Sequence, residues 1–134
     1  MTSPVTVLVY SDNSAIRRRV IGALGERPKR DLPEFAYLEI ATMAMLLRRM
    51  DCGGIDVAIL DGEATPAGGM GIARQLKEDL DHRPPLILLI GRPVDSWLAR
   101  WSHADMAIPY PLKPALLTDA IVGLLTTRAV STTR

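Results

Sequence analysis

The hydrophobic residues of this chain fall into five short runs that are separated by longer segments of mixed polarity. These runs are rich in Val, Ile and Leu and are bounded by Gly, Pro, Ser, Asn and Asp, which predicts β-strands, the most apolar of them buried on both faces of a sheet. The predicted strands are Val5–Tyr10, Phe35–Ile40, Ile55–Asp61, Leu86–Ile90 and Met106–Tyr110.

The intervening segments carry apolar residues at helical spacing, so each predicted strand is followed by a predicted helix. In the second helix we expect the inward-facing side chains to be Met43, Leu46, Leu47 and Met50. The predicted helices are Ala15–Leu24, Thr42–Met50, Met70–Leu80, Val94–His103 and Ala115–Leu125. Regular alternation of strand and helix predicts an α/β fold, in which right-handed crossovers build a parallel sheet with helices on both faces.

Prolines indicate which strands lie at the edges of this sheet. Pro33 stands just before the second predicted strand, and Pro109 and Pro111 stand in and after the fifth. Proline has no N–H to donate to a ladder of hydrogen bonds, so within sheets it is confined mainly to edges. We therefore expect the second and fifth strands at the two edges.

Composition narrows the class of protein. A length of 134 residues fits a single domain over 1–134, with a polar tail at 126–134 that we expect to fray. The net charge of +1 gives no general attraction to nucleic acid. With Cys52 as the single cysteine, no secretory signal and no apolar run long enough to span a membrane, a cytoplasmic location is expected.

Polar residues follow several of the predicted strands. Ser11 and Asp12 follow the first, Asp61 ends the third, and Lys113 comes shortly after the fifth. Ligands of open parallel sheets bind outside the carboxyl ends of the strands, and we expect these residues to lie together at that end of the sheet. Two carboxylates there suit Mg²⁺, a lysine balances anionic oxygens, and a carboxylate between them can accept a phosphoryl group. The alternative is that Asp61 merely caps the turn that follows it.

Three short motifs occur in order along the chain: Val-Tyr-Ser-Asp at 9–12, Leu-Asp at 60–61 before a turn rich in Pro and Gly, and Leu-Lys-Pro at 112–114. Together, over about residues 5–125, they resemble the response-regulator (CheY-like) receiver domain. The resemblance implies a flavodoxin-like, doubly wound sheet of five parallel strands in the order 2-1-3-4-5. That order also places the second and fifth strands at the edges.

The resemblance also implies roles for individual residues. Asp61 would be the phosphoacceptor, Asp12 a metal ligand and the backbone carbonyl of Glu63 another. Lys113 would contact the phosphoryl oxygens, and Tyr110 would be the aromatic residue that changes rotamer on activation.

The chain departs from the family pattern at three positions. Ser11 stands where the family has a second acid, and a hydroxyl is a poorer cation ligand than a carboxylate. Gly91 stands where the family has a Ser or Thr whose hydroxyl bonds the phosphoryl group. Arg92 replaces a small residue and could reach Asp61 or Asp12 in place of a cation, or could lie exposed on a turn. The resemblance therefore implies a receiver with an altered acidic pocket and weak or absent Mg²⁺ binding.

The function implied is a stand-alone signalling protein of the two-component, or phosphorelay, type, with a histidine kinase or another signalling protein as partner. It would not be an enzyme beyond Mg²⁺-dependent self-phosphorylation from a small phosphodonor. One alternative is an interaction module that works without phosphorylation. A flavodoxin-like electron carrier is less favoured, because Asp12 in the loop after the first strand would repel a flavin phosphate.

Three further expectations concern the second half of the chain. Trp97 and Trp101 lie on one side of the short fourth helix and could form, with the fifth strand and fifth helix, a homodimer face, although both could equally be core residues. Because Gly91 has no side chain, coupling between Asp61 and Tyr110 is expected to be weak. The resemblance implies a cis peptide bond before Pro114.

Overall fold

A computed structural model describes residues 4–28, 30, 32–62, 84–91 and 105–132 of the chain, with side-chain detail as far as residue 126. Its five strands are all parallel and form one sheet in the order β2-β1-β3-β4-β5. They are β1 (Val5–Tyr10), β2 (Phe35–Ile40), β3 (Val57–Asp61), β4 (Leu86–Ile90) and β5 (Met106–Pro109). The predicted strand order is confirmed, and the proline-flanked strands β2 and β5 lie at the edges.

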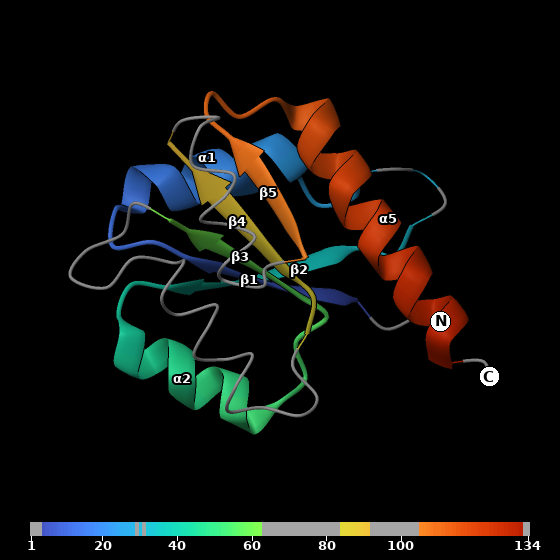
Figure 1. The fold of residues 1–134 in the computed structure, drawn as a ribbon, viewed down its shortest axis with the longest axis horizontal. Coiled ribbons are helices and arrows are strands. Elements are labelled where there is room, and N and C mark those ends of the chain that lie inside the picture. The colour runs from blue at the N-terminus through green and yellow to red at the C-terminus, as the bar shows by residue number, and fades with distance from the viewer. Residues whose placement is uncertain (1–3, 29, 31, 63–83, 92–104, 133–134) are drawn as a thin grey trace.

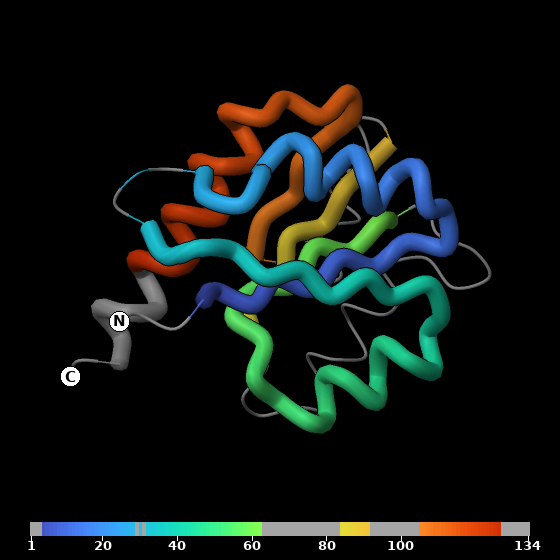
Figure 2. The backbone as a smooth tube through the Cα atoms, turned by 180° about the vertical axis from the view of Figure 1, so that it is seen from behind, coloured from blue at the N-terminus to red at the C-terminus, as the bar shows by residue number. Residues whose placement is uncertain are grey.

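Helices cover both faces of the sheet. α1 (Ser14–Leu24) and α5 (Pro114–Thr132) lie side by side on one face, and α2 (Met43–Cys52) lies on the other (Figures 1 and 2). The helices predicted at 70–80 and 94–103 fall outside the described residues. Among the described residues, none of the helices combines the length and apolar composition needed to cross a membrane.

The central strands supply most of the buried core. Every residue of β3 and β4 is buried, as expected for strands covered on both faces. Their side chains alternate between two clusters, one on the α2 side with Leu46 and Met50, and one on the α1 and α5 side with Val20 and Leu117. The packed sheet thus determines where the end of each strand lies.

Local sequence signals account for the ends of α1 and α2. The Asn13 side chain accepts from the N–H of Ala15 at the start of α1, and the Thr42 side chain accepts from the N–H of Met45 at the start of α2. Gly25 and Gly53 end these helices with φ values of 72° and 75°, which a residue with a Cβ adopts only at a cost.

The structure corrects three expectations. Met43 is 38% exposed and not inward-facing, because it is the first residue of α2 and Leu46, one turn later, is the first to reach the sheet. The cis peptide bond precedes Pro111, not Pro114. The last helix continues to Thr132, beyond the predicted end at Leu125.

Candidate functional site

Four of the residues singled out from the sequence lie at the carboxyl end of the sheet, where the strands end. Ser11 follows β1, Asp61 ends β3, Gly91 follows β4 and Tyr110 follows β5. Backbone hydrogen bonds continue the ladder to these tips: Ser11 N–H donates to the Ile40 carbonyl, and Tyr110 N–H donates to the Ile90 carbonyl. The backbone positions of Ser11 and Tyr110 are thus set by the sheet itself.

Asp61, at the carboxyl end of the central strand β3, is buried, with 3% of its surface exposed. The hydroxyl of Ser11 donates to Asp61 Oδ2 at 2.8 Å, and Ser11 is fully buried. Ser11 Oγ in turn accepts from the N–H of Asn13 at 3.0 Å. A buried carboxylate needs hydrogen-bond donors, and the residue at position 11 provides one where a second acid would have repelled it.

Tyr110 reaches the other oxygen of the same carboxylate. Its hydroxyl donates to Asp61 Oδ1 at 3.4 Å, a long contact in a partly buried setting. The ring packs against the core cluster on the α1 and α5 side of the sheet. Both oxygens of Asp61 therefore have a hydroxyl donor, one from each side.

Arg17 also lies at this end of the sheet, although the sequence pattern gave it no role. Its Nη1 donates to the Ser11 carbonyl at 2.6 Å, and its Nε pairs with Glu39 Oε1 of β2 at 3.1 Å. Only 15% of the Arg17 side chain is exposed. The guanidinium thus ties α1, the loop after β1 and the edge strand together. The sequence offered one signal for this role: Arg17 lies in the first turn of the helix that follows the polar end of β1.

The carboxylate of Asp12 and the ammonium of Lys113 are on more exposed residues. Lys113 precedes α5, where its carbonyl accepts from Leu117 N–H at 3.1 Å. Among the described residues, Arg17 forms an ion pair with Glu39, and none joins Lys113 to Asp61. The structure therefore brings Ser11, Asp61 and Tyr110 into contact but does not pair the lysine with the acid.

Asp12 and Asp61 affect the pKa of Tyr10, the last residue of β1. Burial raises the pKa of the Tyr10 hydroxyl, and the negative charges of Asp12 and Asp61 raise that pKa further. These two carboxylates thus act electrostatically on the same buried group.

The residues present fit Mg²⁺ only in part. Magnesium in proteins takes one or two carboxylates and completes its shell with water and phosphate oxygens. Asp12 and Asp61 can supply those carboxylates, but the Ser11 hydroxyl already donates to one Asp61 oxygen. Over the described ranges, no cluster of three or more His, Cys, Asp or Glu side chains offers a metal site. Glu63, Arg92, Trp97 and Trp101 lie outside the described residues.

Comparison with known proteins decides the family. An uncharacterized response regulatory protein of Mycobacterium tuberculosis, present in strains CDC 1551 and H37Rv, is 54% identical over 124 residues, which are 92% of this chain and 93% of the relative. This chain belongs to the response-regulator family. No protein-family model matches it.

Solved structures support the same fold for this response regulator. The CheY-like receiver domain from Methanospirillum hungatei superposes with a TM-score of 0.76 at 18% identity, covering 96% of this chain and 99% of that domain. The receiver domain of a histidine kinase from Syntrophus aciditrophicus gives a TM-score of 0.77 at 22% identity, covering 92% and 91%. The chain therefore has the flavodoxin-like fold of CheY-like receiver domains, and its 54% identical relative makes it a response regulator.

Proposed function

We propose that this response regulator accepts a phosphoryl group on Asp61 from a histidine kinase, and that Ser11 makes the reaction slow. The observation that carries the proposal is the 2.8 Å hydrogen bond from Ser11 Oγ to Asp61 Oδ2. It holds the acid at the tip of β3 in one orientation in a buried place. The same bond occupies an oxygen that a cation would otherwise use.

The transfer needs few parts. A carboxylate oxygen of Asp61 attacks the phosphorus of a phosphohistidine, the new O–P bond forms as the N–P bond breaks, and the histidine nitrogen keeps the electron pair. From a small acyl phosphate the same attack breaks the O–P bond of the donor and releases a carboxylate. In either case the product is an aspartyl phosphate, so the protein is the acceptor of the group and not an enzyme that turns over a separate substrate.

Mg²⁺ would be held by Asp12, Asp61 and the backbone carbonyl of Glu63, as in the family. When bound, it would neutralise charge on the transferring phosphoryl oxygens. Because Ser11 replaces a carboxylate, we propose that the affinity for Mg²⁺ is weak. Lys113, exposed just before α5, would contact the phosphoryl oxygens.

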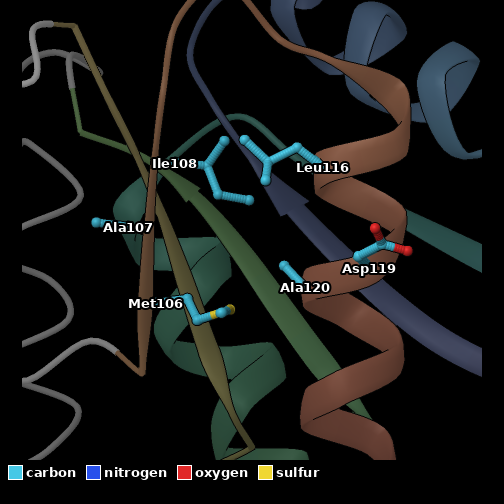
Figure 3. Close-up of a pocket in the computed structure, with 6 residues that line it drawn as sticks. All are labelled: Met106, Ala107, Ile108, Leu116, Asp119 and Ala120. Atoms are coloured by element: carbon cyan, nitrogen blue, oxygen red, sulfur yellow. The ribbon is translucent and has the colours of Figure 1, made fainter.

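The partner surface is proposed along β5 and α5. A groove between them is lined by Met106, Ala107, Ile108, Leu116, Asp119 and Ala120 (Figure 3). Met106 is 42% exposed and Leu116 is 48% exposed, so apolar surface is open to a partner. We propose this face, together with Trp97 and Trp101 of the helix predicted from the sequence at 94–103, for a homodimer or for another signalling protein. Sedimentation of Leu116→Ser against wild type tests the homodimer.

The test of phosphorylation is labelling by acetyl phosphate, followed by intact-protein mass spectrometry. We expect a single added phosphoryl group on the wild-type chain that Asp61→Ala abolishes. Ser11→Asp should label faster at low Mg²⁺, because it adds the missing carboxylate ligand. If neither the wild type nor Ser11→Asp is labelled, Asp61 is not an acceptor, and the domain instead works as a phosphorylation-independent interaction module.

A further inference from the structure

We propose that Tyr110 covers the reactive oxygen of Asp61 and sets the rate at which that oxygen accepts a phosphoryl group. The proposal rests on the proposed function, since it concerns the same acceptor. It assigns to the Tyr110 hydroxyl a direct contact with the reacting atom, which is a different role from a rotamer change that follows activation at a distance.

The hydroxyls of Ser11 and Tyr110 contact the two oxygens of Asp61 at different distances. Oδ2 receives a short hydrogen bond, 2.8 Å, from a fully buried serine. Oδ1 receives a 3.4 Å hydrogen bond from Tyr110, whose side chain is only half-buried. A donor can approach a carboxylate oxygen only from a side that is open or can be opened. Oδ1, on the side of the half-buried tyrosine, is therefore the oxygen that reacts.

The surroundings of the two hydroxyls explain why the tyrosine is the one that gives way. Ser11 is held by its N–H on Ile40, by the N–H of Asn13 on its hydroxyl and by Arg17 on its carbonyl. Displacing Ser11 would break this whole set of contacts. The backbone N–H of Tyr110 donates to the Ile90 carbonyl, and a rotation of the side chain leaves that bond intact while it moves the ring against the cluster on the α1 and α5 side.

A hydroxyl on Oδ1 slows attack by that oxygen in two ways. The hydrogen bond stabilises the negative charge that must be shared with phosphorus, and the ring occupies space on the approach side. Removing the hydroxyl while keeping the ring isolates the first effect. Tyr110→Phe is therefore expected to label roughly two- to tenfold faster than wild type, the factor that corresponds to one ordinary hydrogen bond.

The experiment compares three full-length chains with acetyl phosphate and Mg²⁺: wild type, Tyr110→Phe and the matched control Tyr37→Phe. Tyr37 also donates its hydroxyl, to the Gly25 carbonyl, but at the end of α1 away from Asp61. The rate is measured against donor concentration. We expect Tyr110→Phe to raise the maximal rate at an unchanged half-saturating concentration, and Tyr37→Phe to behave as wild type. A general loosening of the fold would instead accelerate both variants.

The outcomes separate the two proposals. If wild type and Tyr110→Phe are labelled at equal rates, or the variant is slower, the role of Tyr110 is refuted while Asp61 remains the acceptor. Labelling of the variant alone would be the strongest support for Tyr110 as a cover. If neither is labelled, the acceptor role fails and the rate effect fails with it. The contact itself is checked by ¹⁹F NMR of 3-fluorotyrosine protein, where Asp61→Ala should shift the Tyr110 signal more than that of Tyr37; an unmoved Tyr110 signal would refute the contact.

Discussion

The hydrogen bond between Ser11 and Asp61 should contribute to the stability of the fold, and this can be tested without any phosphodonor. Ser11→Ala removes the hydroxyl that donates to Asp61 Oδ2, and Asp61 is only 3% exposed in the wild-type structure. Water cannot readily replace the lost donor at so buried a site. We therefore expect the variant to unfold more easily than wild type, because alanine lacks the hydroxyl and puts no other donor in its place.

The magnitude follows from the kind of bond. A hydrogen bond to a charged group contributes about 1.5–3 kcal/mol to stability. The second bond of Ser11, from the N–H of the exposed Asn13, adds little because water can take its place. For a domain of this size a loss of about 2 kcal/mol corresponds to a decrease in Tm of roughly 5–10 °C.

Urea unfolding followed by circular dichroism measures the loss, and a double-mutant cycle with Asp61→Ala assigns it. The cycle is needed because Asp61→Ala also removes a buried charge and can stabilise the protein by itself. We expect a coupling energy of about 1.5–3 kcal/mol between the two side chains. Ser14→Ala, at an exposed position of α1, is the matched control. A coupling near zero, or equal losses in both serine variants, would show that the bond contributes nothing.

Two further predictions concern other parts of the fold. Burial raises the pKa of Tyr37 to about 12, above the value of about 10 in an unfolded chain, so its stabilising effect is complete below pH 10 and is lost between pH 10 and 12. The free energy of unfolding should accordingly fall less steeply over that range in Tyr37→Phe than in wild type, and equal slopes would contradict the assignment. Asp105→Ala removes the acceptor of the Leu86 N–H at the start of β4, where Asp105 Oδ2 lies at 2.7 Å, and should cost about 1–2 kcal/mol in urea unfolding. Asp51→Ala, on an exposed turn of α2, should cost much less, and a similar loss in both would refute a specific role for Asp105.

The sheet could be predicted from sequence because its signals are local and strong. Three of its strands, Val5–Tyr10, Phe35–Ile40 and Leu86–Ile90, have the predicted bounds. The edge positions followed from prolines, whose missing N–H is a property of the residue alone. The first turn of α2 was misjudged because helical periodicity says which side of a helix is apolar but not where the sheet beneath it begins. Met43 satisfies the period and still lies beyond the covered surface.

The candidate site was less predictable because its contacts join residues far apart in the chain. From the sequence, Ser11 and Asp61 were expected at the same end of the sheet, and the serine was interpreted as a weak cation ligand. It could not show that the serine acts as a donor to the acid, since that depends on the spacing of two strand tips. Arg17 was missed for the same reason. A helix-surface arginine and a loop-anchoring one have the same sequence pattern, and only the carbonyl of Ser11 distinguishes them.

Tyr110 shows how one contact changes an argument made from residue types. Gly91 lacks the hydroxyl that links acceptor to aromatic residue in the family, which predicts weak coupling between Asp61 and Tyr110. That argument assumes that the coupling must pass through the residue after β4. The Tyr110 hydroxyl reaches Asp61 Oδ1 directly, so the two groups can influence one another without an intermediate. A phosphoryl group on Oδ1 would occupy the place of that hydroxyl, and the ring would have to respond. The absence of a side chain at Gly91 then removes one route of coupling and leaves a shorter one, the single hydrogen bond between Tyr110 and Asp61.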